Sequence, residues 1–197
     1  MDSVGPTKEG SMSALPGELP YSSVDPEEAL KYAIQHHARE RVQIIEGVIE
    51  PMTLGWDHEA TASHLRCRLN DKVRALGCVM GSGDLDLPGS SNWFVPDVAV
   101  VPCALAKGGG ALLPGQTLLV VEVTSEDSGD TDRVVKPRRY AEYGAPLYLL
   151  IDRRDCACTL FSEPGRLGYT RAVGPLPFGQ PIDLPEPFGL SLDTSEF

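Results

Sequence analysis

The stretch VVEVTSEDSGDTDRVVK, residues 120–136, places a carboxylate inside a segment that has the composition of a buried strand. Its first part belongs to the run TLLVVEVTS, residues 117–125, whose apolar residues would occupy both faces of a strand. Such a run predicts a central strand in a sheet that is covered on both sides. Glu122 lies within this run, and an isolated charge in an apolar interior is costly unless it is paired or binds a cation.

The rest of the chain predicts an α/β fold with a mixed central sheet flanked by helices and with antiparallel strands at the C-terminal end. The expected helices cover residues 22–40, 57–77 and 132–144. The expected strands cover residues 41–52 (a hairpin or one bulged strand), 78–87, 93–101, 117–125 and 146–152, and short strands follow between residues 156 and 185. We expect residues 1–24 to be a flexible segment and residues 25–197 to form a single domain.

The composition is that of an ordinary globular protein with one substantial core. The chain has 197 residues, of which 42% are hydrophobic and 23% are charged. It has no apolar run near the roughly 18–20 residues that a membrane helix requires, and no basic segment followed by an apolar one near its N-terminus. We therefore expect no membrane association and a cytoplasmic location. The five cysteines form no C-x-x-C motif, which argues against a disulfide framework or a zinc site.

The formal net charge of −11 argues against a surface that attracts nucleic acid in general. Acidic residues that hold a divalent cation reverse this argument locally, because the bound ion becomes the largest charge in the site.

Three ionisable residues could form such a site. Asp97 follows Pro96 at the expected start of one strand, Glu122 lies in the next strand, and Lys136 lies on the helix that follows. If the two strands are neighbours, both carboxylates reach one place, where a hard cation with oxygen ligands would remove their repulsion. A helix also places Asp132, Lys136 and Tyr140 on one face, and Ser125 follows the strand end.

Structural roles are the alternatives for each of these residues. Asp97 could cap a loop, Glu122 could form an ion pair with Lys136 or with an arginine, and Lys136 could be a helix residue that faces solvent. Asp132 stands just before the expected helix, where an N-cap is the usual role. Tyr140 could be a core residue with a hydrogen-bonded hydroxyl.

The ordered set of these motifs resembles the PD-(D/E)xK nuclease superfamily and, within it, the bacterial family of putative restriction endonucleases. The resemblance rests on Pro96-Asp97, on VEVTS at residues 121–125, and on the ordered positions Asp132, Lys136, Tyr140, Gly144, Tyr148 and Asp152. It implies a restriction-endonuclease-like core, with Asp97 and Glu122 as ligands of Mg²⁺ (or Mn²⁺) and a water activated by the metal. The superfamily's lysine two positions after the glutamate is replaced by Thr124, so the resemblance assigns its role to Lys136.

The sequence departs from the family pattern at two further positions. Gln43 stands where the family often has a glutamate in the first hairpin, and it could support the site through its amide. Pro137 disfavours a helical conformation at Lys136, so the helix is expected to begin later or to kink. The resemblance predicts an Mg²⁺-dependent endonuclease acting on DNA, with a homodimer as the expected assembly. The alternative is a catalytically weak or inactive nuclease-fold protein that serves as a binding or assembly module.

Overall fold

We describe a computed structural model of the chain, in which residues 25–37, 41–52, 55–124 and 130–197 are placed. The expected flexible segment 1–24 and Ser125 lie outside the described residues.

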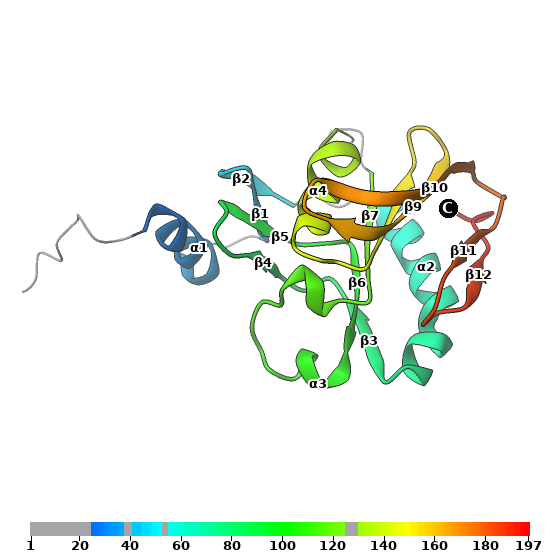
Figure 1. The fold of residues 1–197 in the computed structure, drawn as a ribbon, viewed down its shortest axis with the longest axis horizontal. Helices are drawn as coiled ribbons and strands as arrows, with labels where there is room; N and C mark the ends of the chain where they lie inside the picture. The colour runs from blue at the N-terminus through cyan, green and yellow to red at the C-terminus, as the bar shows by residue number, and fades with distance from the viewer. Residues whose placement is uncertain (1–24, 38–40, 53–54, 125–129) are drawn as a thin grey trace, which may run out of the picture.

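A six-stranded mixed sheet forms the centre of the molecule (Figure 1). Its strands, in order across the sheet, are β10 (Gly168–Pro177), β9 (Ala157–Gly165), β8 (Leu147–Asp152), β7 (Leu119–Val123), β6 (Val98–Pro102) and β3 (Cys78–Gly81). β7 and β8 are parallel, and the other neighbouring pairs are antiparallel. The prediction of a mixed central sheet is therefore confirmed, with the strand that carries Glu122 in its interior.

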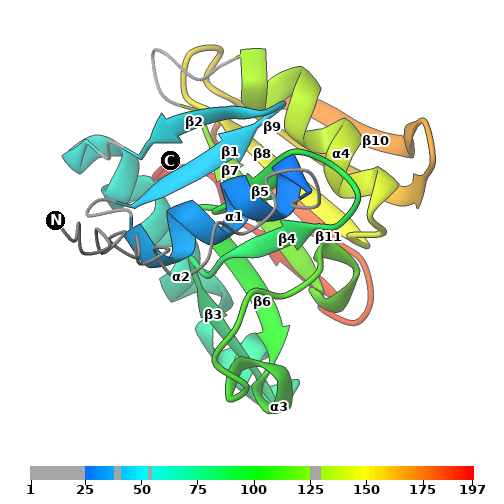
Figure 2. The ribbon, with the colours of Figure 1, turned by 90° about the vertical axis from the view of Figure 1, so that its left-hand side faces the viewer.

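Different elements cover the two faces of this sheet, as Figures 1 and 2 show. On one face lie helix α2 (Trp56–Ala75) and the antiparallel pair β11 (Ile182–Leu184) and β12 (Leu190–Leu192). On the other lie helix α4 (Lys136–Glu142) and a second sheet in the order β2 (Val48–Pro51), β1 (Val42–Ile45), β5 (Asn92–Phe94) and β4 (Leu85–Leu87). Helix α1 (Pro26–His37) packs on this second sheet through the ion pair of Lys31 with Asp86.

Alternation along β7 decides which face each of its residues meets. Val121 and Val123 pack in the core beneath α2, whereas Val120 packs in the cluster that contains Tyr140 of α4 and Tyr148 of β8. Successive strand residues point to opposite faces, so Glu122 shares the face of Val120. The central strand is apolar on both sides, as predicted, and Glu122 points toward α4.

The structure corrects several boundaries. Residues 78–87 form two strands, β3 and β4, instead of one, and residues 93–101 are divided between β5 and β6. Pro96 lies in this division, since it has no N–H for a ladder bond and restricts the residue before it. The segment between β6 and β7 contains the short helix α3 (Cys103–Ala106) and a 3-10 turn (Pro114–Gln116).

In the part of the chain that the structure describes, no helix is long and apolar enough to cross a membrane.

Candidate active site

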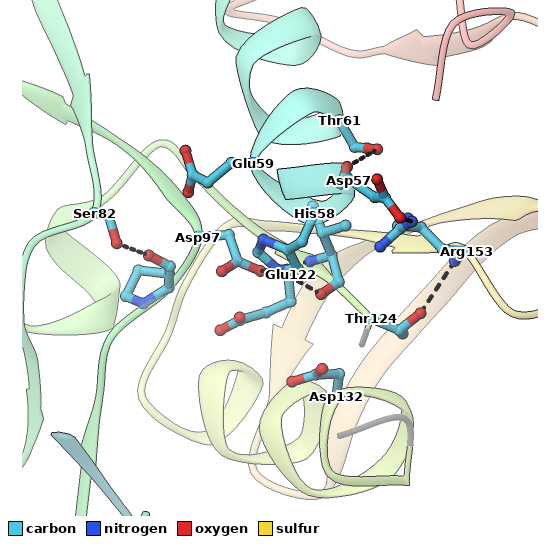
Figure 3. Close-up of polar contacts among 12 residues, drawn as sticks. Asp57, His58, Glu59, Thr61, Ser82, Asp97, Glu122, Thr124, Asp132 and Arg153 are labelled. Carbon is cyan, nitrogen blue, oxygen red and sulfur yellow. Dashed lines mark hydrogen bonds and ion pairs between the residues drawn. The ribbon is translucent and has the colours of Figure 1, made fainter. Parts of the chain in front are cut away.

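Asp97 and Glu122 lie side by side at the end of two neighbouring strands. β6 pairs with β7 so that Val98 is opposite Val121. Asp97 precedes Val98 and Glu122 follows Val121, so the same antiparallel register brings the two acidic residues together (Figure 3). Both are buried, with 7% of Asp97 and 1% of Glu122 exposed.

Several contacts fix the position of Asp97. Its Oδ2 accepts a hydrogen bond from the Val123 amide at 2.7 Å and lies 3.1 Å from Nε2 of His58. The carbonyl of Asp97 accepts a bond from Arg66 of α2 at 2.9 Å, and the Ser82 hydroxyl donates to the carbonyl of Pro96. Both side-chain contacts end on Oδ2, so neither of them engages Oδ1.

His58 connects the first turn of α2 to both strands. Its Nε2 lies 3.0 Å from the carbonyl oxygen of Val123 as well as 3.1 Å from Asp97. Both neighbours are acceptors, so Nε2 carries a hydrogen and donates. Burial favours the neutral ring, but the hydrogen bond and the charge of Asp97 prevail and raise the pKa of His58. The sequence shows His58 only as a helix-start residue that could cap or contact substrate, since the partners that give it a role are 39 and 65 positions away (97 − 58 and 123 − 58).

Glu122 is held by two groups from α4. Its Oε2 lies 2.9 Å from Nζ of Lys136, and its Oε1 accepts a hydrogen bond from the Tyr140 hydroxyl at 2.7 Å. Burial dominates over the charge of Lys136 and raises the pKa of Glu122 to about 8. The predicted contact of Glu122 with Lys136 is present at ion-pair distance, although burial disfavours the charged form of the carboxyl group, and Tyr140 is a core residue with a hydrogen-bonded hydroxyl. A bound cation would stabilise the ionised form of Glu122 that burial disfavours.

Lys136 points into the site, and Pro137 does not displace it. α4 begins at Lys136, which puts Pro137 in the first turn, where a missing N–H is tolerated. Nζ of Lys136 lies 3.0 Å from Oδ1 of Asp132, one helical turn earlier. The charges of Glu122 and Asp132 outweigh burial and raise the pKa of Lys136, so this side chain is an ammonium. Of the two expected effects of Pro137, the later start is the one observed, since the α-helix begins at Lys136 and a π-helix (Thr131–Val135) leads into it.

Asp132 is a buried partner of Lys136 and not an N-cap. It lies within the π-helix, its side chain is turned toward the ammonium, and Tyr148 donates a hydrogen bond to its carbonyl at 2.6 Å. Its neighbour Arg133 binds both carboxylate oxygens of Asp152, at 2.6 and 2.8 Å. The π-helix is thus attached to β8 at two points, near its start through Tyr148 and at its end through Asp152.

Gln43 and Thr124 complete the set of residues considered in the sequence. Gln43 is buried on β1, and no described residue makes a hydrogen bond to its Oε1. Gln43 shares a strand face with Ile45, which packs in the cluster that contains Val120 and Tyr140, so its amide faces the same interior as Glu122. Thr124 accepts a bond from the Arg153 amide and donates one to Asp152, which makes it a structural residue of the strand end.

The donors present fit a hard divalent cation. The carboxylates of Asp97 and Glu122 face the same interior as the amide oxygen of Gln43, which has no hydrogen-bond partner among the described residues. Mg²⁺ is usually held by one or two carboxylates together with several waters. Among the described residues, no three His, Cys, Asp or Glu side chains are grouped so as to hold an ion. A cation would therefore be bound by Asp97 and Glu122, with Gln43 as an uncharged third donor.

Comparison with known protein families identifies the family of this chain. Residues 26–195 match the model of the Uma2 family, described as "Putative restriction endonuclease". The chain belongs to this family. The match spans every element that builds the site, from β1 to α4, and the predicted resemblance to a family of putative restriction endonucleases is confirmed.

A solved structure has the same fold. It is the 1.96 Å crystal structure of a putative nuclease belonging to DUF820 from Anabaena variabilis ATCC 29413. The two chains superpose with a TM-score of 0.65 and 18% sequence identity, over 85% of this chain and 95% of the other. At this identity the similarity shows the fold alone. The curated proteins contain no match.

Proposed function

We propose that this Uma2 protein is a divalent-metal-dependent endonuclease that hydrolyses phosphodiester bonds in DNA. The observation that carries the proposal is the placement of Asp97, Glu122 and Lys136 around one point at the strand ends. Two adjacent buried carboxylates with an ammonium beside them form an electrostatic arrangement suited to a cation and a phosphate.

Asp97 and Glu122 would hold Mg²⁺ or Mn²⁺, which as a bound ion supplies a Lewis acid for phosphoryl oxygens and lowers the pKa of water. His58 and the Val123 amide keep Asp97 oriented. An ammonium has three N–H donors, and Lys136 directs two of them to Glu122 and Asp132. We assign the third to the attacking water or to a phosphate oxygen, where the charge of Lys136 would stabilise the transition state.

The experiment is a cleavage assay on plasmid DNA with Mg²⁺ or Mn²⁺, with EDTA as the metal-free arm. We expect wild-type protein to nick or cut the plasmid, and Asp97→Ala and Glu122→Ala to lose this activity. Asp193→Ala is a matched control, since Asp193 is an exposed acidic residue that pairs with Arg68 away from the site. Equal cleavage by wild type and both site variants would refute the assignment.

A second candidate is a nuclease-fold protein without catalysis that acts as a binding or assembly module. It is favoured by the fact that both oxygens of Glu122 already have partners, Lys136 and Tyr140. It predicts no binding of Mg²⁺ or Mn²⁺ in calorimetry by a folded protein, whereas the endonuclease predicts binding that Glu122→Ala abolishes.

A homodimer would place two such sites on the two strands of a duplex, since most homo-oligomers have two-fold symmetry. Sedimentation analysis with and without duplex DNA tests this proposal, and a monomer under both conditions would contradict it.

A further inference from the structure

The π-helix that precedes Lys136 ends at a residue that cannot continue its hydrogen-bond pattern. Within the π-helix, the amide of Lys136 donates to the carbonyl of Thr131, five positions earlier. The next bond in the same pattern would run from residue 137 to the carbonyl of Asp132. Residue 137 is a proline, which has no N–H.

The hydroxyl of Tyr148 provides a donor at this carbonyl. Tyr148 lies on β8, is fully buried, and donates to the Asp132 carbonyl at 2.6 Å. Its ring packs between those of Tyr140 and Phe161, with centroid distances of 5.5 and 5.7 Å. The hydroxyl therefore occupies the place of the missing amide from a rigid position in the core.

The hydrogen bond from Tyr148 ends on Asp132, the residue whose carboxylate contacts Lys136. The carbonyl of Asp132 and its side chain belong to one residue, so a donor that restrains the carbonyl also restrains the backbone position from which the carboxylate extends toward Lys136. That carboxylate lies 3.0 Å from Nζ of Lys136, which in turn lies 2.9 Å from Glu122. A π-helical hydrogen bond spans one residue more than an α-helical one, and π-helical turns occur often at functional sites. Relaxation of this turn to α-helical geometry would rotate Asp132 relative to Lys136.

We propose that Tyr148 is a positioning residue for the ammonium of Lys136: its hydroxyl replaces the N–H that Pro137 lacks and keeps the π-helix in the register that aims Lys136 at Glu122. The role of Lys136 in cleavage rests on the proposed endonuclease function, but the positioning itself does not.

The test combines Tyr148→Phe with Pro137→Ala. Tyr148→Phe removes the hydroxyl and keeps the ring, whereas Pro137→Ala restores an N–H at position 137. The matched control is Tyr169→Phe, because Tyr169 belongs to the same aromatic cluster and its hydroxyl also donates to a backbone carbonyl, that of Ala145 at 2.9 Å, away from the site.

The first readout is the side-chain ammonium signal of Lys136 in ¹⁵N NMR, assigned with Lys136→Arg, since an ordered buried ammonium exchanges its protons slowly. We expect Tyr148→Phe to broaden or shift this signal and Tyr169→Phe to leave it in place. We also expect the melting temperature to fall by about 2–4 °C in both phenylalanine variants, because each loses one buried hydrogen bond.

The second readout is the plasmid cleavage rate, which we expect Tyr148→Phe to lower about tenfold, equivalent to 1.4 kcal/mol, and Tyr169→Phe to leave unchanged. The double variant Tyr148→Phe/Pro137→Ala should regain part of the NMR signal and of the rate. If Tyr148→Phe keeps the wild-type Lys136 signal and behaves like Tyr169→Phe, the proposal is overturned. If wild type cleaves nothing while the Lys136 signal responds as expected, the positioning role stands and the endonuclease proposal fails.

Discussion

The ammonium nitrogen of Lys136 lies 2.9 Å from Oε2 of Glu122, and only 4% of the lysine and 1% of the glutamate are exposed. Water screens such a pair very little, so each group depends on the other for compensation of its charge. The burial of Glu122 still raises its pKa to about 8. A cation that binds here therefore competes with a proton, and this relationship leads to the first prediction.

Without metal, Glu122 should make the protein less stable as the pH rises. Its pKa is about 8 in the folded protein and 4.5 by reference, so its stabilising contribution is complete below pH 4.5 and is lost as the pH rises through about 8. We expect the free energy of unfolding in EDTA, relative to Glu122→Gln, to fall by a few kcal/mol between about pH 5 and pH 9. Urea denaturation at several pH values measures this difference, and a constant difference would contradict the prediction.

In the variant Gln43→Glu, the stability of the folded protein should depend on bound metal more strongly than in wild type. A third carboxylate facing Asp97 and Glu122 adds repulsion in a buried place, so the metal-free variant should be less stable than wild type. Added Mg²⁺ should stabilise the variant more than wild type, because another charged ligand raises the affinity and binding stabilises the folded state. Thermal unfolding with Mg²⁺ or with EDTA measures both effects. A variant that is destabilised equally in both conditions would show that Gln43 does not face the cation.

His58→Gln and His58→Leu should differ in metal affinity and in cleavage rate. The side chain of glutamine can still donate an N–H toward Asp97, whereas leucine leaves Oδ2 of Asp97 with the Val123 amide alone. We expect His58→Leu to lower metal affinity and cleavage by roughly 10–100-fold, the usual effect of losing a group that orients a metal ligand, and His58→Gln to retain most of both.

His64→Gln is the control for this pair, since His64 lies on the same helix and is exposed. Calorimetric titration with Mn²⁺ gives the affinities. Equal affinities for the glutamine and leucine variants would show that the hydrogen bond to Asp97 is not what orients it.

Asp152→Asn should weaken the attachment of the π-helix to the end of β8 and make the stability of the folded protein less sensitive to acid. Burial opposes ionisation of Asp152, but the two hydrogen bonds from Arg133 outweigh it and lower the pKa of Asp152. A lowered pKa gives stability that is present above the ordinary value of 3.8 and is lost as the pH falls through the folded-state value. We expect Asp152→Asn to cost about 1.5–3 kcal/mol at pH 7 and less at pH 3.

Acid titration of the melting temperature checks this prediction. Asp193→Asn serves as a comparison, because Asp193 pairs with Arg68 at the surface, where ion pairs contribute little. A loss in Asp152→Asn that is the same at pH 3 and pH 7 would argue against an ionic role for Asp152.

Local sequence pattern predicted the strands and the helical segment that carry the candidate site residues. The apolar run around Glu122 predicted a central strand, and Pro96-Asp97 placed the second carboxylate near the start of its neighbour. The spacing of Asp132, Lys136 and Tyr140 placed all three on one side of a helical segment, where Lys136 and Tyr140 both contact Glu122. These predictions succeeded because strand and helix periodicity are properties of a few consecutive residues.

The sequence by itself determined the α/β class, the strand that carries Glu122 and the helical segment that carries Lys136. Only the tertiary structure decided that His58 contacts Asp97, that Gln43 faces the same interior as Glu122, and that Lys136 reaches Glu122 although Pro137 follows it. It also decided that the Tyr148 hydroxyl donates to the carbonyl of Asp132. The physical reason is that each of these contacts joins residues far apart in the chain. A hydrogen bond forms only when packing brings donor and acceptor within about 3 Å, and no local periodicity encodes that distance.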